Sequence, residues 1–139
     1  MSKKTTTTDP VRSDIMRAVK SADTKPEMIV RRLVYAMGYR YRLHRKDLPG
    51  KPDLVFGLRR KAIFVNGCFW HGHDCVRGAR EPKANAEYWR AKIARNVERD
   101  TANKIALKAA GWSVITVWEC QTKARDRADL EHKLHGFLD

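Results

Sequence analysis

The chain has 139 residues, enough for one domain with a layered hydrophobic core but too few for two. Lysine and arginine outnumber aspartate and glutamate by 29 to 16, and the net charge of +13 creates a positive field that attracts polyanions, most commonly nucleic acid. No apolar run approaches the ~20 residues of a membrane helix and no secretory signal is present, so we expect a cytosolic protein that does not contact membranes.

The N-terminal part of the sequence predicts an arm followed by two helices. Residues 1–11 are polar and basic and are expected to form a flexible arm, and residues 12–20 fit a short helix at the start of a single domain that continues to residue 139. The segment TKPE is a strong helix start, because Thr24 can cap the helix and Glu27 can complete a capping box. This second helix is expected to end at Gly38.

The remaining elements predict an α/β fold with a mixed sheet flanked by helices. Short alternating or β-branched segments predict strands at 39–44, 53–56, 61–66 and 113–119. Helical periodicity predicts helices at 85–110 and 125–138. The apolar stripe of the long helix contains Trp89, Ile93 and Val97. A right-handed crossover through this helix would make strands 61–66 and 113–119 parallel, with their C-terminal ends at one edge of the sheet.

The segment NGCFWHGHDC, residues 66–75, has the composition of a metal-binding loop. Three cysteines in a reducing compartment argue against a disulfide framework. Cys68 follows one strand of the expected parallel pair and Cys120 ends the other. A closed structural zinc site would use Cys68, Cys75, Cys120 and either His71 or His73. The alternative is three cysteines buried as small apolar residues, with the histidines exposed.

Phe69 and Trp70 lie between the expected ligands. On a metal-braced loop of a basic protein, two large rings could enter between DNA base pairs as a wedge. Packing of both rings in the core is the alternative, and the residues alone do not decide between the two.

Carboxylates form a second group of candidate site residues. Asp53 directly follows a proline at the start of an apolar strand, where nucleases hold a hard cation such as Mg²⁺. Glu27 and Asp100 are further candidates. Asp100 follows Val97 on the inward stripe of the long helix and therefore needs a partner, which His71 or a lysine could supply.

Four segments, LPGKPDLV, FVNGCFWHGHDC, KIARNVERD and GWSVITVWEC, together resemble the very-short-patch mismatch-repair endonucleases, the Vsr family. The resemblance extends from about Met16 to Cys120. It implies a fold similar to type II restriction enzymes of the PD-(D/E)xK class. It also implies an enzyme that uses Mg²⁺ and a structural zinc, and that nicks DNA 5′ of the thymine in a T·G mismatch left by deaminated 5-methylcytosine.

The resemblance also implies roles for individual residues. Asp53 becomes the magnesium ligand, helped by the backbone carbonyl of Val65. His71 becomes the catalytic histidine, oriented by Asp100, and Glu27 falls on an active-site glutamate.

The zinc and DNA-binding roles follow from the same resemblance. His73, rather than His71, becomes the zinc ligand beside the three cysteines. Phe69 and Trp70 fall on the aromatic wedge, and Met16 falls on an N-terminal helix that intercalates with them.

Asn66 departs from the family pattern, which has a histidine at this active-site position. Asparagine can donate a hydrogen bond to phosphate but cannot carry a proton or a positive charge near neutral pH. Lys51 or Lys61 is therefore a candidate to compensate for the missing imidazole.

The leading hypothesis is thus a nicking enzyme that acts as a monomer on double-stranded DNA with a T·G mismatch, with other mismatch-repair proteins as further candidate partners. One alternative is a sequence-specific restriction-type nuclease that cuts both strands. Another is a zinc-braced DNA-binding module without catalysis. His44, His132 and His135 are expected on solvated faces.

Overall fold

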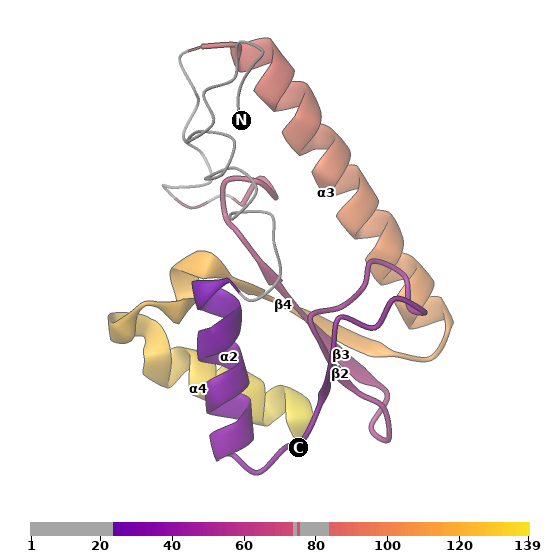
Figure 1. Cartoon of the computed structure of the whole chain (residues 1–139), viewed down its shortest axis with the longest axis vertical. Coiled ribbons are helices and arrows are strands. Elements are labelled where there is room, and N and C mark those ends of the chain that lie inside the picture. Colours follow the sequence, from indigo (N-terminus) through magenta and orange to yellow (C-terminus); the bar gives the residue numbers. More distant parts are fainter. Residues whose placement is uncertain (1–23, 74, 76–83) are drawn as a thin grey trace, which may run out of the picture.

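The computed structural model describes residues 24–73, 75 and 84–139. The expected arm over 1–11 and the expected helix over 12–20, with Met16, lie outside these residues. The described chain forms a mixed four-stranded sheet with helices on both faces (Figure 1). None of its helices has the length and apolarity needed to cross a membrane.

The sheet has the strand order β1-β2-β3-β4, with bounds β1 Arg42–Leu43, β2 Leu54–Phe56, β3 Lys61–Asn66 and β4 Ser113–Trp118. The first three strands are antiparallel neighbours, and residues 57–60 form the tight turn between β2 and β3. β3 and β4 pair in parallel along their whole length, with Asn66 opposite Trp118. The predicted parallel pair is confirmed, and its C-terminal ends lie at one edge of the sheet.

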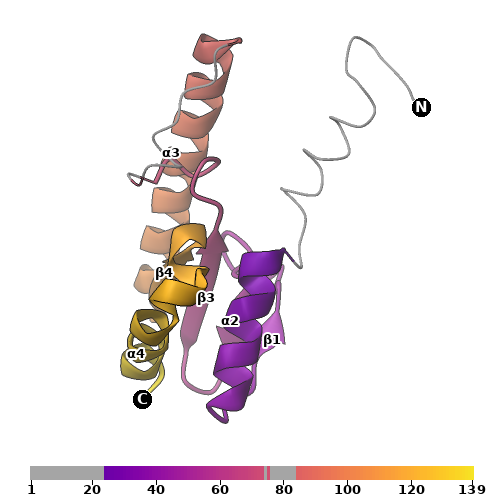
Figure 2. The same ribbon diagram turned by 90° about the vertical axis from the view of Figure 1, so that its left-hand side faces the viewer.

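Three α-helices are described: α2 Lys25–Ala36, α3 Ala86–Ala109 and α4 Arg127–Leu138, the last preceded by 3₁₀ turns η1 Glu119–Thr122 and η2 Ala124–Asp126. The backbone N–H of Glu27 donates to the hydroxyl of Thr24 at 3.4 Å, so the predicted N-cap of α2 is confirmed. α2 and α4 lie on one face of the sheet, and α3 lies on the other (Figure 2).

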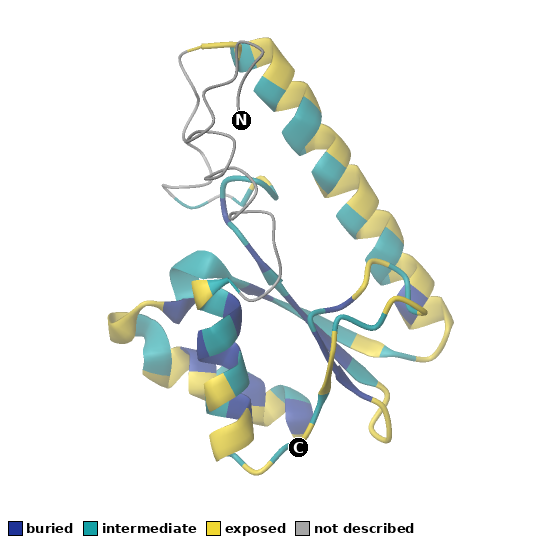
Figure 3. Ribbon diagram, viewed as in Figure 1, coloured by how far each residue is buried: buried dark blue, intermediate teal, exposed yellow. Residues whose placement is uncertain are grey.

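The hydrophobic core fills the space between the sheet and the pair α2 and α4. Its buried side chains are Val30, Val34, Leu54, Phe56, Ile63, Val117, Leu130, Leu134 and Leu138. Figure 3 shows the buried residues concentrated on these facing surfaces. Each such side chain contributes about 1.5–3 kcal/mol when it is fully removed from water. The core thus holds the sheet rigid, and the candidate site residues project from its edge.

Two sequence predictions about the fold need correction. The strand expected over 39–44 pairs only at Arg42–Leu43, although Tyr39 and Tyr41 pack against the core on one side as alternate strand residues would. Val97 was expected on the inward stripe of α3 but is 41% exposed. Val97 lies in the middle of α3, where the turn at Gly72 rather than the sheet packs against it and leaves part of its side chain in solvent.

Candidate active site and metal centre

A cleft of about 1460 Å³ opens between the start of α2, the ends of β2 and β3, the turn after β3 and the middle of α3. The predicted site residues among its lining are Glu27, Asp53, Val65, Asn66, Phe69, Trp70, His71 and Asp100. These residues come from five separate segments of the sequence. The fold therefore brings together the groups that the sequence singled out for catalysis and for DNA contact.

Asp53 lies just before β2 and is held against β3. The backbone N–H of Val65 donates to Asp53 Oδ2 at 2.7 Å. The N–H and C=O of one strand residue point to the same side, so the Val65 carbonyl also faces Asp53. Burial, as the largest cause, and the neighbouring charge of Glu27 together raise the pKa of Asp53 to about 6, against the lowering effect of the Val65 hydrogen bond. A dication beside Asp53 would favour its ionised form.

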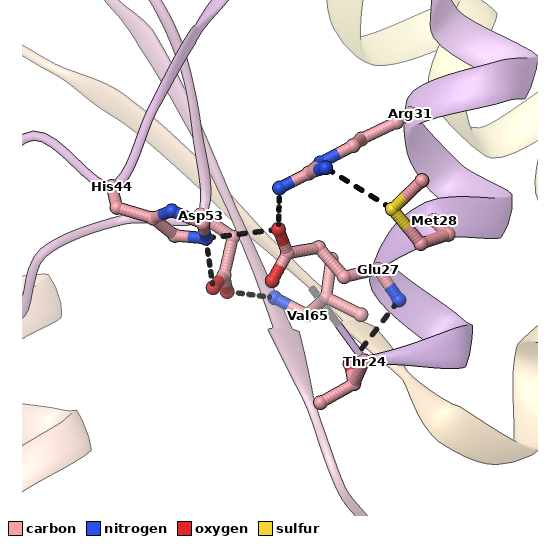
Figure 4. Close-up of polar contacts among 7 residues, drawn as sticks. All are labelled: Thr24, Glu27, Met28, Arg31, His44, Asp53 and Val65. Atoms are coloured by element: carbon pink, nitrogen blue, oxygen red, sulfur yellow. Dashed lines mark hydrogen bonds and ion pairs between the residues drawn. The ribbon is translucent and has the colours of Figure 1, made fainter. Parts of the chain in front are cut away.

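Glu27 lies next to Asp53 with its side chain only 3% exposed. A buried carboxylate needs partners, and Arg31, one turn further along α2, donates to Glu27 Oε2 at 2.5 Å. The ring of His44 contacts the same oxygen at 2.9 Å (Figure 4). In a capping box the Glu27 carboxylate would bind the backbone of Thr24. Here Glu27 Oε2 instead contacts Arg31 and His44 in the cleft.

His44 is a residue that the sequence analysis placed wrongly. It was expected on a solvated face, but its Nε2 lies 2.9 Å from Glu27 and 3.8 Å from Asp53 Oδ1. No motif marks this position, since His44 ends an alternating basic strand. The same expectation is confirmed for His132 and His135, both of which are exposed on α4.

His71 and Asp100 form a pair across the turn and the long helix. His71 Nδ1 lies 2.5 Å from Asp100 Oδ2. An ionised carboxylate only accepts hydrogen bonds, so Nδ1 carries the proton and Nε2 carries the lone pair. The predicted need of Asp100 for a partner is met by His71, and the pair has the geometry of a carboxylate-oriented general base.

Asn66 is 7% exposed at the end of β3 and lines the cleft. Of the two lysines considered as compensation, Lys51 also lines the cleft. Lys61 begins β3 at its opposite end and donates to the Phe137 carbonyl at 2.5 Å. Lys61 is therefore excluded as a substitute for an imidazole at position 66.

A cluster of three cysteines and one histidine lies directly behind the cleft. The ligand atoms of Cys68, His73, Cys75 and Cys120 all lie within 4.8 Å of one another. The structure groups His73 with the cysteines, since His73 Nδ1 is 3.6 Å from Cys120 Sγ, whereas His71 contacts Asp100. Burial raises the pKa of Cys68 to about 12. A cation beside the buried Cys68 thiol would favour its ionised form, and three thiolates with one imidazole match the ligand preference of zinc.

Gly72 separates the two histidines. It has a left-handed φ of +63°, and a Cβ built there would lie 2.9 Å from Val97 Cγ2 on α3. Glycine therefore allows the turn to pack against α3. This sharp turn directs His71 toward the cleft and His73 toward the cysteines.

Phe69 and Trp70 lie at the cleft wall and are half-buried. Their rings meet edge to face with centroids 5.0 Å apart, and Trp70 meets Trp89 of α3 at 5.2 Å. Asn96 of α3 also donates to the Trp70 carbonyl at 2.9 Å. Among the described residues, the core cluster does not include either ring. The packing partners Trp89 and Asn96 were not identified as site residues from the sequence.

Glu119 joins the metal cluster to the cleft and was also missed from the sequence. The Cys68 backbone N–H donates to Glu119 Oε1 at 3.3 Å, and Glu119 itself lines the cleft. Basic side chains line the same cleft as its carboxylates; they are Lys25, Lys46, Lys51, Lys92 and Arg99. An acidic centre within a basic wall fits a site that attracts a polyanion and holds a cation.

Comparison with known proteins also points to an enzyme that acts on DNA. Residues 5–77 match the family described as DNA mismatch endonuclease Vsr. The chain is 50% identical to the type II nicking enzyme V.XorIIP of Xanthomonas oryzae pv. oryzae, over 90% of each chain. It is 40% identical to DNA mismatch endonuclease Vsr of Escherichia coli, over 84% of this chain and 74% of that one. The chain therefore belongs to the Vsr family of DNA endonucleases.

Proposed function

We propose that this protein is a Mg²⁺-dependent endonuclease that nicks DNA 5′ of the thymine in a T·G mismatch, and thereby starts very-short-patch repair of deaminated 5-methylcytosine. The observation that carries the proposal is the cleft in which Asp53, the His71–Asp100 pair and the two aromatic rings converge. The relative named as a mismatch endonuclease supports the choice of substrate, and the relatives named as nicking enzymes support the cutting of one strand. The family also supports a restriction-endonuclease-like fold.

Asp53 and the Val65 carbonyl are the groups that would hold Mg²⁺. Mg²⁺ prefers oxygen ligands and binds through few protein groups, completing its shell with water and phosphate. The buried Asp53 carboxyl, with its raised pKa, gains from a cation that fixes its ionised form. When bound, Mg²⁺ polarises the scissile phosphate and stabilises the charge that develops on it.

His71 is the proposed general base or acid. Its Nδ1–H is held by Asp100, so its Nε2 lone pair is the group available to a water or a leaving oxygen. Asp100 fixes the tautomer and stabilises the imidazolium that forms when His71 takes a proton. Asn66, at the end of β3, can donate a hydrogen bond to phosphate but cannot share this proton transfer.

Phe69 and Trp70 are the proposed wedge, with Met16 as a further intercalating residue. Trp89 packs against both rings and Asn96 holds the Trp70 carbonyl, so the turn is supported from α3. A T·G pair stacks less well than a Watson–Crick pair, so opening a step beside it costs less. The wedge would thus convert this local weakness into selectivity, while the basic residues of the cleft supply affinity for the backbone.

Zinc is proposed as a structural ion held by Cys68, His73, Cys75 and Cys120. Its four ligands come from the turn after β3 and from the end of β4. An ion there would fix the short segment that carries Phe69, Trp70 and His71. A closed set of four protein ligands leaves no open position for chemistry.

The test is a nicking assay with Mg²⁺ on end-labelled duplexes that differ only in one base pair, T·G or a matched pair. We expect a nick 5′ of the mismatched thymine and no cut in the opposite strand. Cleavage of both strands of matched duplex would favour the restriction-type alternative. Binding without cleavage of any duplex would favour the non-catalytic zinc-braced module and overturn the proposal.

A further inference from the structure

His44 contacts the acidic centre from outside the cleft. Glu27 and Asp53 both line the cleft, whereas among the described lining residues His44 is absent. Its ring reaches both carboxylates, at 2.9 Å and 3.8 Å, its side chain is 28% exposed, and it lines a second, smaller depression with Arg42, Arg45, Lys46 and Asp47. Among the described residues, His44 is thus not part of the cleft lining, and it reaches the cleft through its contacts with the two carboxylates.

Glu27 depends on partners for its position. With 3% of its side chain exposed, an ionised carboxylate here is costly unless it is hydrogen-bonded. Arg31 and His44 approach the same oxygen, Oε2, from different sides (Figure 4). Arg31 belongs to the same helix as Glu27, so its contact does not connect Glu27 to the sheet. His44 supplies a connection from the sheet.

The backbone of His44 is tied to Asp53. Its N–H donates to the Asp53 carbonyl at 3.2 Å, just beyond the last paired residues of β1 and β2. His44 has a left-handed φ of 48°, a conformation that few residues other than glycine adopt and that the surrounding contacts must hold. One residue thus joins the strand that carries Asp53 to the helix that carries Glu27.

We propose that His44 is a positioning residue of this site: its Nε2–H donates to Glu27 and holds that carboxylate beside Asp53. This inference rests on the proposed nuclease function. An ionised carboxylate accepts only, so the shared contact requires the proton on Nε2. The ligand atoms of Glu27, His44 and Asp53 also lie within 4.8 Å of one another. Arg31 and His44 both contact Glu27 Oε2, so in this structure that oxygen is engaged by two hydrogen-bond donors.

Two amide variants test the role of the donor. In His44→Gln the amide nitrogen follows Cα by as many bonds as Nε2 and can replace it, whereas in His44→Asn the amide is too short. We expect His44→Asn to lower kcat for nicking by about tenfold or more with DNA affinity within about twofold, and His44→Gln to recover most of the rate. Equal losses in both variants, with a higher Mg²⁺ requirement, would show a metal ligand and overturn the proposal.

A double-mutant cycle with Glu27→Gln tests whether His44 acts through Glu27. We expect His44→Asn to change both kcat and urea unfolding much less once Glu27 is replaced. Fully additive effects would overturn the proposal. If the parent protein nicks no duplex, the proposed function fails by itself. The unfolding cycle on the whole chain then still decides the contact, and additivity there would contradict it.

Discussion

His71 and Asp100 meet at 2.5 Å although they come from a turn after β3 and from the middle of α3. The contact fixes which ring nitrogen of His71 bears the proton, and it ties the turn with the aromatic pair to the long helix. Both residues line the cleft, and neither belongs to the hydrophobic core cluster.

Asp100→Asn is expected to keep the fold and impair the chemistry. The amide can donate to Nδ1, which favours the wrong tautomer and removes the charge that stabilises the imidazolium. Single-turnover nicking of T·G duplex should slow by roughly 10²- to 10⁴-fold, with binding of the same duplex within a fewfold of the parent. Nicking within twofold of the parent would remove this pair from the mechanism.

Asp53 should make stability depend on pH in the metal-free protein. The pKa of Asp53 in the folded protein, about 6, lies above its ordinary value of 3.8. The protonated carboxyl therefore contributes its full stabilisation below about pH 4, and this stabilisation is lost as the pH rises through 6. Asp53→Asn resembles the protonated form. It should be more stable than the parent at pH 8, by on the order of 3 kcal/mol, and nearly equal to it at pH 4.

Urea unfolding of parent and Asp53→Asn at both pH values measures this difference. Added Mg²⁺ should stabilise the parent at pH 8 and leave the variant unchanged, because the variant lacks the ionised ligand. A variant that is less stable than the parent at pH 8 without metal would contradict the raised pKa.

The two neighbouring histidines give a matched test of the zinc site. His73→Gln should lower the zinc content of the purified protein and its melting temperature, since apparent zinc binding energies of about 10 kcal/mol or more are part of the folding energy. His71→Gln should keep one zinc per chain and lose nicking. Elemental analysis and thermal unfolding provide the readouts. Equal zinc content in both variants would show that His73 is not a ligand.

The aromatic wedge is tested by the double substitution of Phe69 and Trp70 to alanine. The ratio of mismatched to matched DNA affinity should fall by about tenfold or more, while the salt-dependent affinity from the basic residues persists. Tyr35→Ala removes an exposed ring from outside the cleft and serves as the control. Binding curves at one fixed salt concentration give the ratios. If the ratio stays at the parent value in a folded protein, the rings serve packing alone.

Much of this site follows from local patterns in the sequence. The paired strand ends predict that Cys68 and Cys120 meet, and the parallel register confirms the geometry on which that prediction depends. Spacing alone could not decide between His71 and His73, because a turn can direct either residue to either side. In the structure His73 lies with the cysteines and His71 with Asp100, on either side of Gly72 with its positive φ.

Other features depend on contacts between distant segments, which no local pattern contains. His44 was misplaced because its partners, Glu27 and Asp53, come from a helix and from the neighbouring strand. Val97 has the helical spacing of a buried residue, but burial also requires an element to pack against. Only the turn at Gly72 is described against Val97, which stays 41% exposed, and periodicity alone could not show this.

The central claim is best tested by the single-turnover nicking rate on two duplexes of identical flanking sequence, one with a T·G pair and one with the matched pair, in excess Mg²⁺. The account predicts one nick, 5′ of the mismatched thymine, at a rate at least about 100-fold above that on matched DNA, a difference of about 2.7 kcal/mol. Equal rates on the two duplexes, or cleavage that persists unchanged in Asp53→Asn, would contradict it.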